Sequence, residues 1–246
     1  MTFSPCLVVP VYNHGNDACE LAERLKPFGL RAIFVNDGSR ASCTETLRQL
    51  SRQNDWIDVI EHEKNQGKGG AVLSGLRAAQ AQGFTHALQI DADNQHDTND
   101  IPRFLATASE NLGAVITGQP LYDASAPVGR KMARYITHVW VWIETLSFTI
   151  RDSMCGFRVY PVEPALRLAN RTKLGQRMDF DSDILVRLFW TGMPVLSLPT
   201  AVIYPPGGQS NFRLFYDNML ITRMHVRLVF GMLWRAPILI YRKALT

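Results

Sequence analysis

Short apolar runs alternate with segments of helical spacing through the first 90 residues of the chain. Such runs are typical of strands buried on both faces, and apolar residues three and four positions apart are typical of amphipathic helices. The expected strands are residues 7–11, 32–35, 57–60 and 86–90, and the expected helices are residues 18–25, 44–50 and 70–81. This alternation predicts an α/β fold with a doubly wound, mostly parallel sheet and flanking helices.

The second half of the chain has a less regular pattern. We expect strands at 114–117 and 157–160 and helices at 131–150 and 181–190. Residues 212–241 combine aromatic and aliphatic residues with basic ones, which predicts an amphipathic helical tail, and Pro237 is expected to prevent one long straight helix. The PPGG sequence at 205–208 is a candidate hinge. We therefore divide the chain into an α/β domain at 1–210 and a tail at 211–246.

Polar clusters follow the expected strands or begin the helices that come after them. They lie at residues 12–14, 36–39, 65–70 and 91–95. In doubly wound sheets, ligands bind beyond the carboxyl ends of the strands. We therefore expect these four clusters to meet at one edge of the sheet.

The sequence LQIDADNQHD at 88–97 carries the strongest candidate chemistry. If the backbone is still extended there, Asp91 and Asp93 point to the same side, since they are two residues apart. Two carboxylates at a strand end suit Mg²⁺ or Mn²⁺, which keep other coordination positions for water and phosphates. The alternative is that Asp91 ends a strand while Asp93 and Asn94 form a turn or cap the next helix.

The charge of the chain is uneven. The net charge is +4, but residues 205–246 hold six arginine or lysine residues against one aspartate, so the rest of the chain is nearly neutral. A basic tail on a neutral domain indicates an anionic surface, either membrane or nucleic acid, rather than a globally basic nucleic-acid binder. Together with the tail's apolar residues, it predicts a membrane-associating segment.

Length and cysteine content set further expectations. A chain of 246 residues with 46% hydrophobic residues fits one large buried core. The four cysteines form no CxxC pair, which indicates reduced thiols in a cytosolic setting. We expect no signal peptide, because the chain does not begin with a charged segment followed by an apolar one. We also expect no membrane-spanning helix, because no uncharged stretch reaches about 18 apolar residues.

Five motifs occur in the order found in family 2 glycosyltransferases. They are VPVYN at 9–13, VNDGS at 35–39, NQGKGGA at 65–71, DADNQ at 91–95 and CGFRVY at 155–160. Over about the first 210 residues the chain resembles the branch of dolichyl- and polyprenyl-phosphate sugar synthases. The resemblance implies a GT-A fold, a UDP- or GDP-sugar donor, a Mg²⁺ or Mn²⁺ cofactor and inversion at the anomeric carbon. It also implies a membrane-embedded lipid acceptor, either a polyprenyl phosphate or a hydroxyl-bearing lipid, at the cytoplasmic face of the membrane.

The resemblance assigns donor-side roles to residues in these motifs. Pro10, Tyr12 and Asn13 would lie beside the nucleotide base, Asp37 would hold the base or ribose, and Lys68 would lie near the nucleotide at a helix start. Asp91, Asp93 and Gln95 would bind the cation, and Ser210 and Arg213 belong to a segment resembling the family's mobile segment over the leaving diphosphate. His14 departs from the family's usual glutamate, which can alter the base that is accepted.

The acceptor-side candidates lie in the second half. Asp152 matches a family aspartate placed to act as a base, and Asp181 is the second candidate. A lipid phosphate is already ionised, so Asp152 would then position the acceptor instead of removing a proton. The alternatives are a surface turn for Asp152 and a helix-start role for Asp181 with its neighbours.

Arg130, Arg134 and His138 recur every four residues and form a cationic edge on a helix that also carries aromatic residues. Such a helix can lie in a membrane interface, and ordinary core packing is an equal alternative.

Two other functions of the protein stay open. One is a sugar-phosphate nucleotidylyltransferase, although VPVYNHGND lacks the usual glycine-rich loop with arginine and lysine. The other is a non-catalytic membrane-binding module derived from a transferase.

Overall fold

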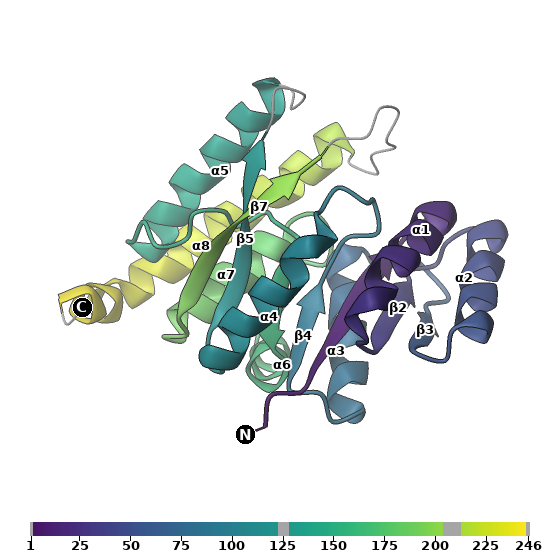
Figure 1. Ribbon diagram of the computed structural model, residues 1–246. Coiled ribbons are helices and arrows are strands. Elements are labelled where there is room, and N and C mark those ends of the chain that lie inside the picture. The colour runs from purple at the N-terminus through teal and green to yellow at the C-terminus, as the bar shows by residue number, and fades with distance from the viewer. Residues whose placement is uncertain (1, 123–127, 204–212, 245–246) are drawn as a thin grey trace.

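The computed structural model describes residues 2–122, 128–203 and 213–244. A seven-stranded sheet runs through the molecule in the order β3-β2-β1-β4-β6-β5-β7 (Figure 1). The strands are β1 (Pro5–Val11), β2 (Ala32–Asn36), β3 (Ile57–Glu61), β4 (His86–Gln89), β5 (Val115–Tyr122), β6 (Arg158–Pro161) and β7 (Val195–Val202). Strands β1 to β4 pair in parallel, whereas β6 is antiparallel to both β4 and β5, and β5 and β7 are parallel. The expected doubly wound, mostly parallel sheet is confirmed.

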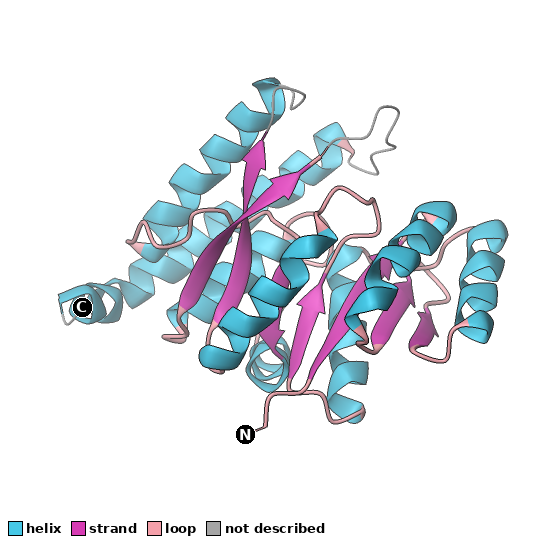
Figure 2. Ribbon diagram, viewed as in Figure 1, coloured by secondary structure: helices cyan, strands magenta, loops and turns pink. Residues whose placement is uncertain are grey.

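Helices cover both faces of the sheet (Figures 1 and 2). They are α1 (Gly15–Leu25), α2 (Ala41–Gln53), α3 (Lys68–Ala81), α4 (Ile101–Glu110), α5 (Val128–Thr145), α6 (Val162–Arg171), α7 (Phe180–Trp190) and α8 (Leu214–Ala244). Because side chains alternate along a strand, Leu7 and Val9 of β1 pack with α1, α2 and α4, while Val8 packs with α3, α6 and α7. Each face of the apolar strands therefore has its own buried core.

Three elements lie where we expected none, namely α4, α6 and β7. Each contains a proline that its position tolerates. Pro102 and Pro164 lie in the first turns of α4 and α6, where a backbone N–H has no helical partner. Pro199 lies in β7, which is an edge strand of the sheet, where proline is tolerated.

Two helix boundaries also differ from expectation. Helix α5 ends at Thr145 rather than at residue 150, because Leu146 adopts a left-handed conformation with φ 51°. Helix α8 continues through Pro237 to Ala244, so the proline does not divide the tail into separate helices. The PPGG sequence at 205–208 lies outside the described residues.

Helix α8 packs against α5 and α7 (Figure 1) and contributes Met224, Leu228 and Met232 to the core behind the sheet. Polar contacts also attach it, since Arg227 donates to Asp183 at 2.5 Å and His225 Nδ1 lies 2.7 Å from Glu144 Oε1. The described part of the tail therefore shares a core with the sheet domain. Within the three described ranges, no helix is both long and apolar enough to cross a bilayer.

We expect Asp183→Asn to lower the free energy of unfolding by about 3 kcal/mol, because the buried carboxylate offsets two guanidinium groups. Arg187 Nε and Arg227 Nη2 lie 2.6 and 2.5 Å from its oxygens, and the Gly175 N–H donates at 2.8 Å. Urea denaturation measures the change. The matched control is Glu163→Gln, which breaks an exposed ion pair with Arg167 and should cost less than about 1 kcal/mol. Equal losses for the two variants would contradict this assignment.

Candidate active site

The loops that follow β1 and β2 are tied together at the carboxyl edge of the sheet. Asn13, with φ 60°, donates its backbone N–H to Ser39 Oγ at 3.0 Å, and its side-chain oxygen accepts the Arg40 N–H at 2.9 Å. Pro10 and Tyr12 are half-buried beside this junction. His14, which departs from the motif that the chain resembles, lies 2.7 Å from Asp17 of α1. The predicted meeting of the first two polar clusters is confirmed.

Asp37 organises the loop before α3. Its buried carboxylate accepts hydrogen bonds from Asn65 Nδ2 at 2.9 Å and from the backbone N–H groups of Gln66 and Gly67 at 2.8 Å each. His62 Nδ1 lies 2.8 Å from the same carboxylate. Because four protein groups already occupy these oxygens, the predicted contact of Asp37 with a base or ribose requires an oxygen to be shared.

Lys68 is the first residue of α3, and its ammonium lies between two carboxylates. Its Nζ is 2.8 Å from Asp91 Oδ2 and 2.7 Å from Asp181 Oδ2. Burial alone lowers the pKa of Lys68, but Asp181 and Asp91 outweigh burial and raise this pKa above its usual range. The cluster brings three predicted site residues together from β4's end, α3 and α7, and it keeps the lysine charged.

The two carboxylates of the DADNQ motif differ in their surroundings. Burial tends to raise the pKa of Asp91, but Lys68 dominates and lowers it. Burial and the charge of Asp91 together raise the pKa of Asp93. Among the described residues, Asp91 Oδ1 is buried with no hydrogen-bond partner. A buried carboxylate oxygen without a partner beside a second carboxylate fits the requirements of a divalent cation.

Backbone approaches this site closely at Gly156 of the CGFRVY motif. A Cβ atom at this position would lie 2.2 Å from Asp91 Oδ2, so any other residue would displace the Asp91 carboxylate. In the part of the chain that the structure describes, no group of three His, Cys, Asp or Glu side chains is arranged to hold a metal ion. The predicted protein ligands are two carboxylates and the amide of Gln95, which is half-buried in the same loop. Such a set fits Mg²⁺ or Mn²⁺, which take further ligands from a diphosphate and water.

Asp152 is fully engaged by neighbours on α5 and by its own loop. Arg134 donates to both of its oxygens at 2.5 and 2.7 Å, and the Met154 and Cys155 N–H groups donate to it at 2.9 and 2.8 Å. His138 Nε2 lies 3.4 Å from it. Burial by itself raises the pKa of Asp152, but Arg134 and His138 outweigh burial and hold this pKa well below its usual range. Asp152 is therefore a buried group whose ionised form is favoured by Arg134, and not the surface turn of the alternative interpretation.

Three further predicted residues lie at the margin of what the structure describes. The side chain of Arg130 and the whole of Ser210 lie outside the described residues. Arg213 is exposed just before α8, and its N–H donates to Asp217 Oδ2 at 2.6 Å.

Asp181 and Asp183 lie in the first turn of α7, as expected. Their side chains form ion pairs, with Lys68 and Arg187 respectively, and do not cap the helix.

Arg158 is a functional candidate that the sequence interpretation missed. It is completely buried, and it donates to the Asp181 and Ser153 carbonyl oxygens at 2.8 and 3.0 Å and to the Tyr160 hydroxyl at 3.1 Å. Tyr160 donates to Gln89 Oε1, and Gln89 Nε2 donates to Asp181 Oδ1, both at 3.2 Å. These bonds fix Asp181 from two sides. An arginine inside an expected buried strand was the available signal, because arginine is almost never fully buried without partners.

Comparison with known proteins places these features in a family. The model of glycosyl transferase family 2 matches residues 6–176. UDP-N-acetylglucosamine--dolichyl-phosphate N-acetylglucosaminyltransferase of Methanococcus voltae is 21% identical over 87% of this chain and 94% of its own length. Human dolichyl-phosphate beta-glucosyltransferase is 24% identical over 78% of this chain and 65% of its own length.

Solved structures share the fold. Glucosyl-3-phosphoglycerate synthase of Mycobacterium tuberculosis, in complex with Mn²⁺, UDP and glucosyl-3-phosphoglycerate, has a TM-score of 0.67 at 13% identity and covers 95% of this chain and 80% of its own. Mannosyltransferase PcManGT of Pyrobaculum calidifontis, in complex with GDP-Man and Mn²⁺, has a TM-score of 0.60 at 13% identity, with 97% and 73% covered. These likenesses confirm the expected GT-A fold. With the family match spanning more than half of its residues, the chain belongs to glycosyl transferase family 2 and is a glycosyltransferase.

Proposed function

We propose that the protein transfers a sugar, with inversion, from a UDP- or GDP-sugar to a membrane-embedded lipid phosphate with the help of Mg²⁺ or Mn²⁺. The observation that carries this proposal is the site at the carboxyl edge of the sheet, where Lys68 pairs with Asp91 and Asp181 while Asp91 Oδ1 has no partner among the described residues. The names of the Methanococcus voltae and human relatives support a dolichyl-phosphate type of acceptor.

On the donor side, Asp91, Asp93 and Gln95 would hold the cation beside the diphosphate. The bound cation supplies Lewis-acid stabilisation of the charge that develops on the leaving nucleoside diphosphate. Lys68 adds a fixed positive charge at the start of α3, where the helix dipole also favours an anion. The loop shaped by Asp37 and the junction at Asn13 would hold the nucleoside.

The engagement of both predicted bases favours a phosphate acceptor over a hydroxyl acceptor. Asp152 has a pKa well below its usual range and is bound by Arg134, so it is a poor proton acceptor. Asp181 accepts from Lys68 on one oxygen and from Gln89 on the other. A lipid phosphate is ionised already and needs no base. Its oxygen would attack the anomeric carbon as the bond to the diphosphate breaks, with Asp152 positioning Arg134 and His138 for the acceptor.

Exposed apolar residues on α5 and α8 support peripheral membrane contact, which the proposal places at the cytoplasmic face. Phe215 and Trp234 of α8 are 86% and 88% exposed, and Tyr135 of α5 is 60% exposed. We call the following residues the apolar face: Met132, Tyr135, Ile136, Trp140, Ile143, Leu214, Phe215, Met219, Val226, Phe230, Leu233, Trp234, Ile238, Ile240 and Tyr241. Large exposed apolar areas mark interaction surfaces, and the exposed Arg223 of α8 suits anionic lipid. Core packing explains buried α5 residues such as Val141, but it does not explain the exposed residues of the apolar face.

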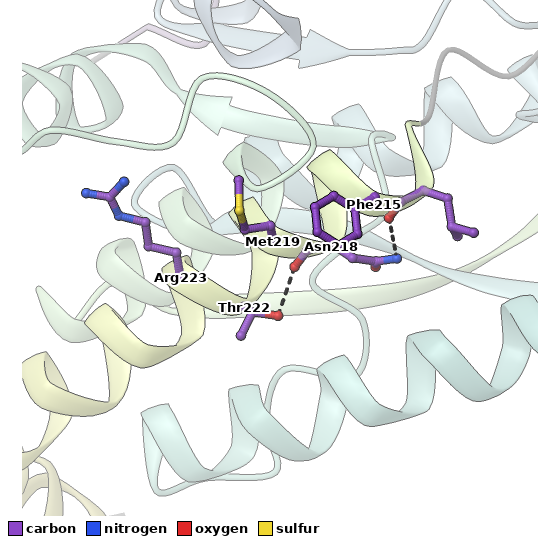
Figure 3. Close-up of a pocket in the computed structure, with 6 residues that line it drawn as sticks. Phe215, Asn218, Met219, Thr222 and Arg223 are labelled. Carbon is purple, nitrogen blue, oxygen red and sulfur yellow. Dashed lines mark hydrogen bonds between the residues drawn. The ribbon is translucent and has the colours of Figure 1, made fainter.

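The start of α8 shows how apolar and basic groups combine (Figure 3). A hollow there is lined by Leu214, Phe215, Asn218, Met219, Thr222 and Arg223. Asn218 and Thr222 turn their polar groups back to the helix carbonyl oxygens of Leu214 and Asn218. The lining therefore presents mainly carbon to its surroundings beside the Arg223 guanidinium, an arrangement that suits lipid chains and their phosphates.

We expect Asp93→Ala to reduce sugar transfer more than about 100-fold, because a direct cation ligand is lost. Thermal unfolding should change little, since Asp93 is not fully buried and the hydrogen bond that it accepts, from the Gln95 N–H at 3.2 Å, is local. Transfer from a radiolabelled nucleotide sugar to polyprenyl phosphate measures the effect. Asp97→Ala is the control, because Asp97 lies in the same loop but, within the described part of the chain, its carboxylate accepts only the nearby Asn99 N–H. Native activity of Asp93→Ala, with metal still required, would place the cation elsewhere.

The variant Asp152→Asn separates the two acceptor chemistries. With a lipid phosphate, we expect KM for the acceptor to rise more than kcat falls, because Arg134 loses its anionic partner. With a hydroxyl acceptor, turnover would instead fall by about 10² to 10⁴. Because the folded-state pKa of Asp152 is lowered, the native carboxylate stays ionised until the pH falls below the usual carboxyl range, so it should add no step to the native pH profile near neutrality. Single-turnover transfer at several pH values tests both statements.

Membrane contact is tested with point variants, because deleting α8 would remove core residues such as Met224. We expect Phe230→Gln and Trp234→Gln each to weaken sedimentation with anionic vesicles about tenfold or more, since each loses burial worth about 1.5–3 kcal/mol. Arg223→Gln should lose about 1 kcal/mol and only at low salt. Leu112→Gln, an exposed apolar residue outside α5 and α8, is the control. Unchanged vesicle binding in all three variants would exclude the apolar face as the contact.

A further inference from the structure

The loop that carries two of the proposed cation ligands contains a residue in a left-handed conformation. Asn94 has φ 58° and lies between Asp93 and Gln95. Asparagine adopts this conformation more readily than other residues except glycine, and its contacts can hold the loop in this shape. The contacts of Asn94 therefore bear on the directions of the side chains on either side of it.

Arg24, in the last turn of α1, is the main neighbour. Its Nη1 donates to the Asn94 side-chain oxygen at 3.2 Å and to the Asn94 carbonyl oxygen at 3.4 Å, and its Nη2 donates to the His96 carbonyl oxygen at 2.9 Å. Asn94 Nδ2 in turn donates to the Asp17 carbonyl oxygen at 3.0 Å. One guanidinium therefore holds the backbone on both sides of Gln95 and ties it to α1.

The opposite side of the loop is fixed by β7. The Ile203 N–H donates to the Gln95 carbonyl oxygen at 3.0 Å, and His96 forms an antiparallel bridge with Val202. Three consecutive carbonyl groups, at residues 94, 95 and 96, thus have donors from outside the loop. Two of these three carbonyl groups are held by Arg24.

We propose that Arg24 is a positioning residue for the cation: by fixing residues 94–96 it sets the directions of the Asp93 and Gln95 side chains. This inference rests on the proposed role of these residues as cation ligands. Mg²⁺ and Mn²⁺ tolerate little deviation in ligand position, and loss of an outer contact to a ligand typically weakens metal binding by about 10- to 100-fold. The planar fork of arginine can reach three acceptors at once, which a lysine ammonium at the same place cannot match.

The direction in which cation affinity changes when Arg24 is replaced separates a positioning role from a purely electrostatic one. A positive charge near the site repels a cation, so removing the charge of Arg24 would by itself strengthen cation binding. Loss of positioning would weaken it. A contact that only joins α1 to the loop would change the free energy of unfolding and leave the cation affinity unaltered.

The test measures Mn²⁺ binding directly, by the electron paramagnetic resonance signal of free Mn²⁺ in the presence of UDP or GDP. We expect Arg24→Gln to weaken Mn²⁺ binding about 10- to 100-fold, and Arg24→Lys to weaken it also, although the charge is kept. Arg31→Gln is the matched control. Arg31 likewise donates to a backbone carbonyl oxygen, that of Asp55, and to a side chain, Asp58, but at the other end of the sheet. The Mn²⁺ affinity of the Arg31→Gln variant should equal that of the native protein.

Asp93→Ala, measured in the same assay, distinguishes a failure of the positioning role of Arg24 from a failure of the proposed cation site. If Asp93→Ala loses Mn²⁺ while Arg24→Gln binds it as well as or better than the native protein, the positioning role is overturned and the proposed cation site stands. If Asp93→Ala also keeps its affinity, the proposed cation site fails and the role of Arg24 fails with it. Thermal unfolding shows whether each variant is folded. If Arg24→Gln does not fold, the Mn²⁺ affinity of Arg24→Lys tests the positioning role.

Discussion

The ion-paired ammonium of Lys68 is the interaction on which the arrangement of this protein depends. It joins the start of α3 to Asp91 at the end of β4 and to Asp181 at the start of α7. Buried charges are costly unless they are paired, so each of these three groups needs the other two. The close approach of backbone at Gly156 and the hydrogen bonds from Gln89 to Asp181 complete the enclosure. The two halves of the chain therefore meet at one electrostatic cluster.

Helix α5 links this cluster to the surface. Arg134 and His138 lie on the side that faces Asp152, whereas Tyr135 and Ile136 are exposed. A single helix can do both because successive residues are about 100° apart around its axis. In the proposed function, one side of α5 would meet an acceptor's phosphate while the other contacts the lipid around it. Helix α8, attached through His225 and Arg227, completes the apolar face.

The charge states within the site also restrict its chemistry. Asp152 and Asp181 are each occupied by a cationic partner, whereas Asp91 keeps one oxygen without a partner among the described residues. Carboxylates paired in this way position neighbours better than they remove protons. The distribution of partners thus separates Asp91 and Asp93, which would bind a cation although Asp91 also pairs with Lys68, from Asp152 and Asp181, which hold Arg134 and Lys68 in place.

The sequence by itself determined the parts that local periodicity encodes: strands β1 to β4, their helices, the polar clusters at one edge and the spacing of Asp91 and Asp93. Its motifs also determined the family. The sequence did not predict α4, α6 and β7, which contain Pro102, Pro164 and Pro199. Proline is acceptable in these elements because it lies at a helix start or in an edge strand. The partners of Asp37, Asp152, Arg158 and Arg24 were decided by tertiary structure alone. Each lies far away in the chain or depends on a loop's conformation, and no local pattern records which buried groups folding brings into contact.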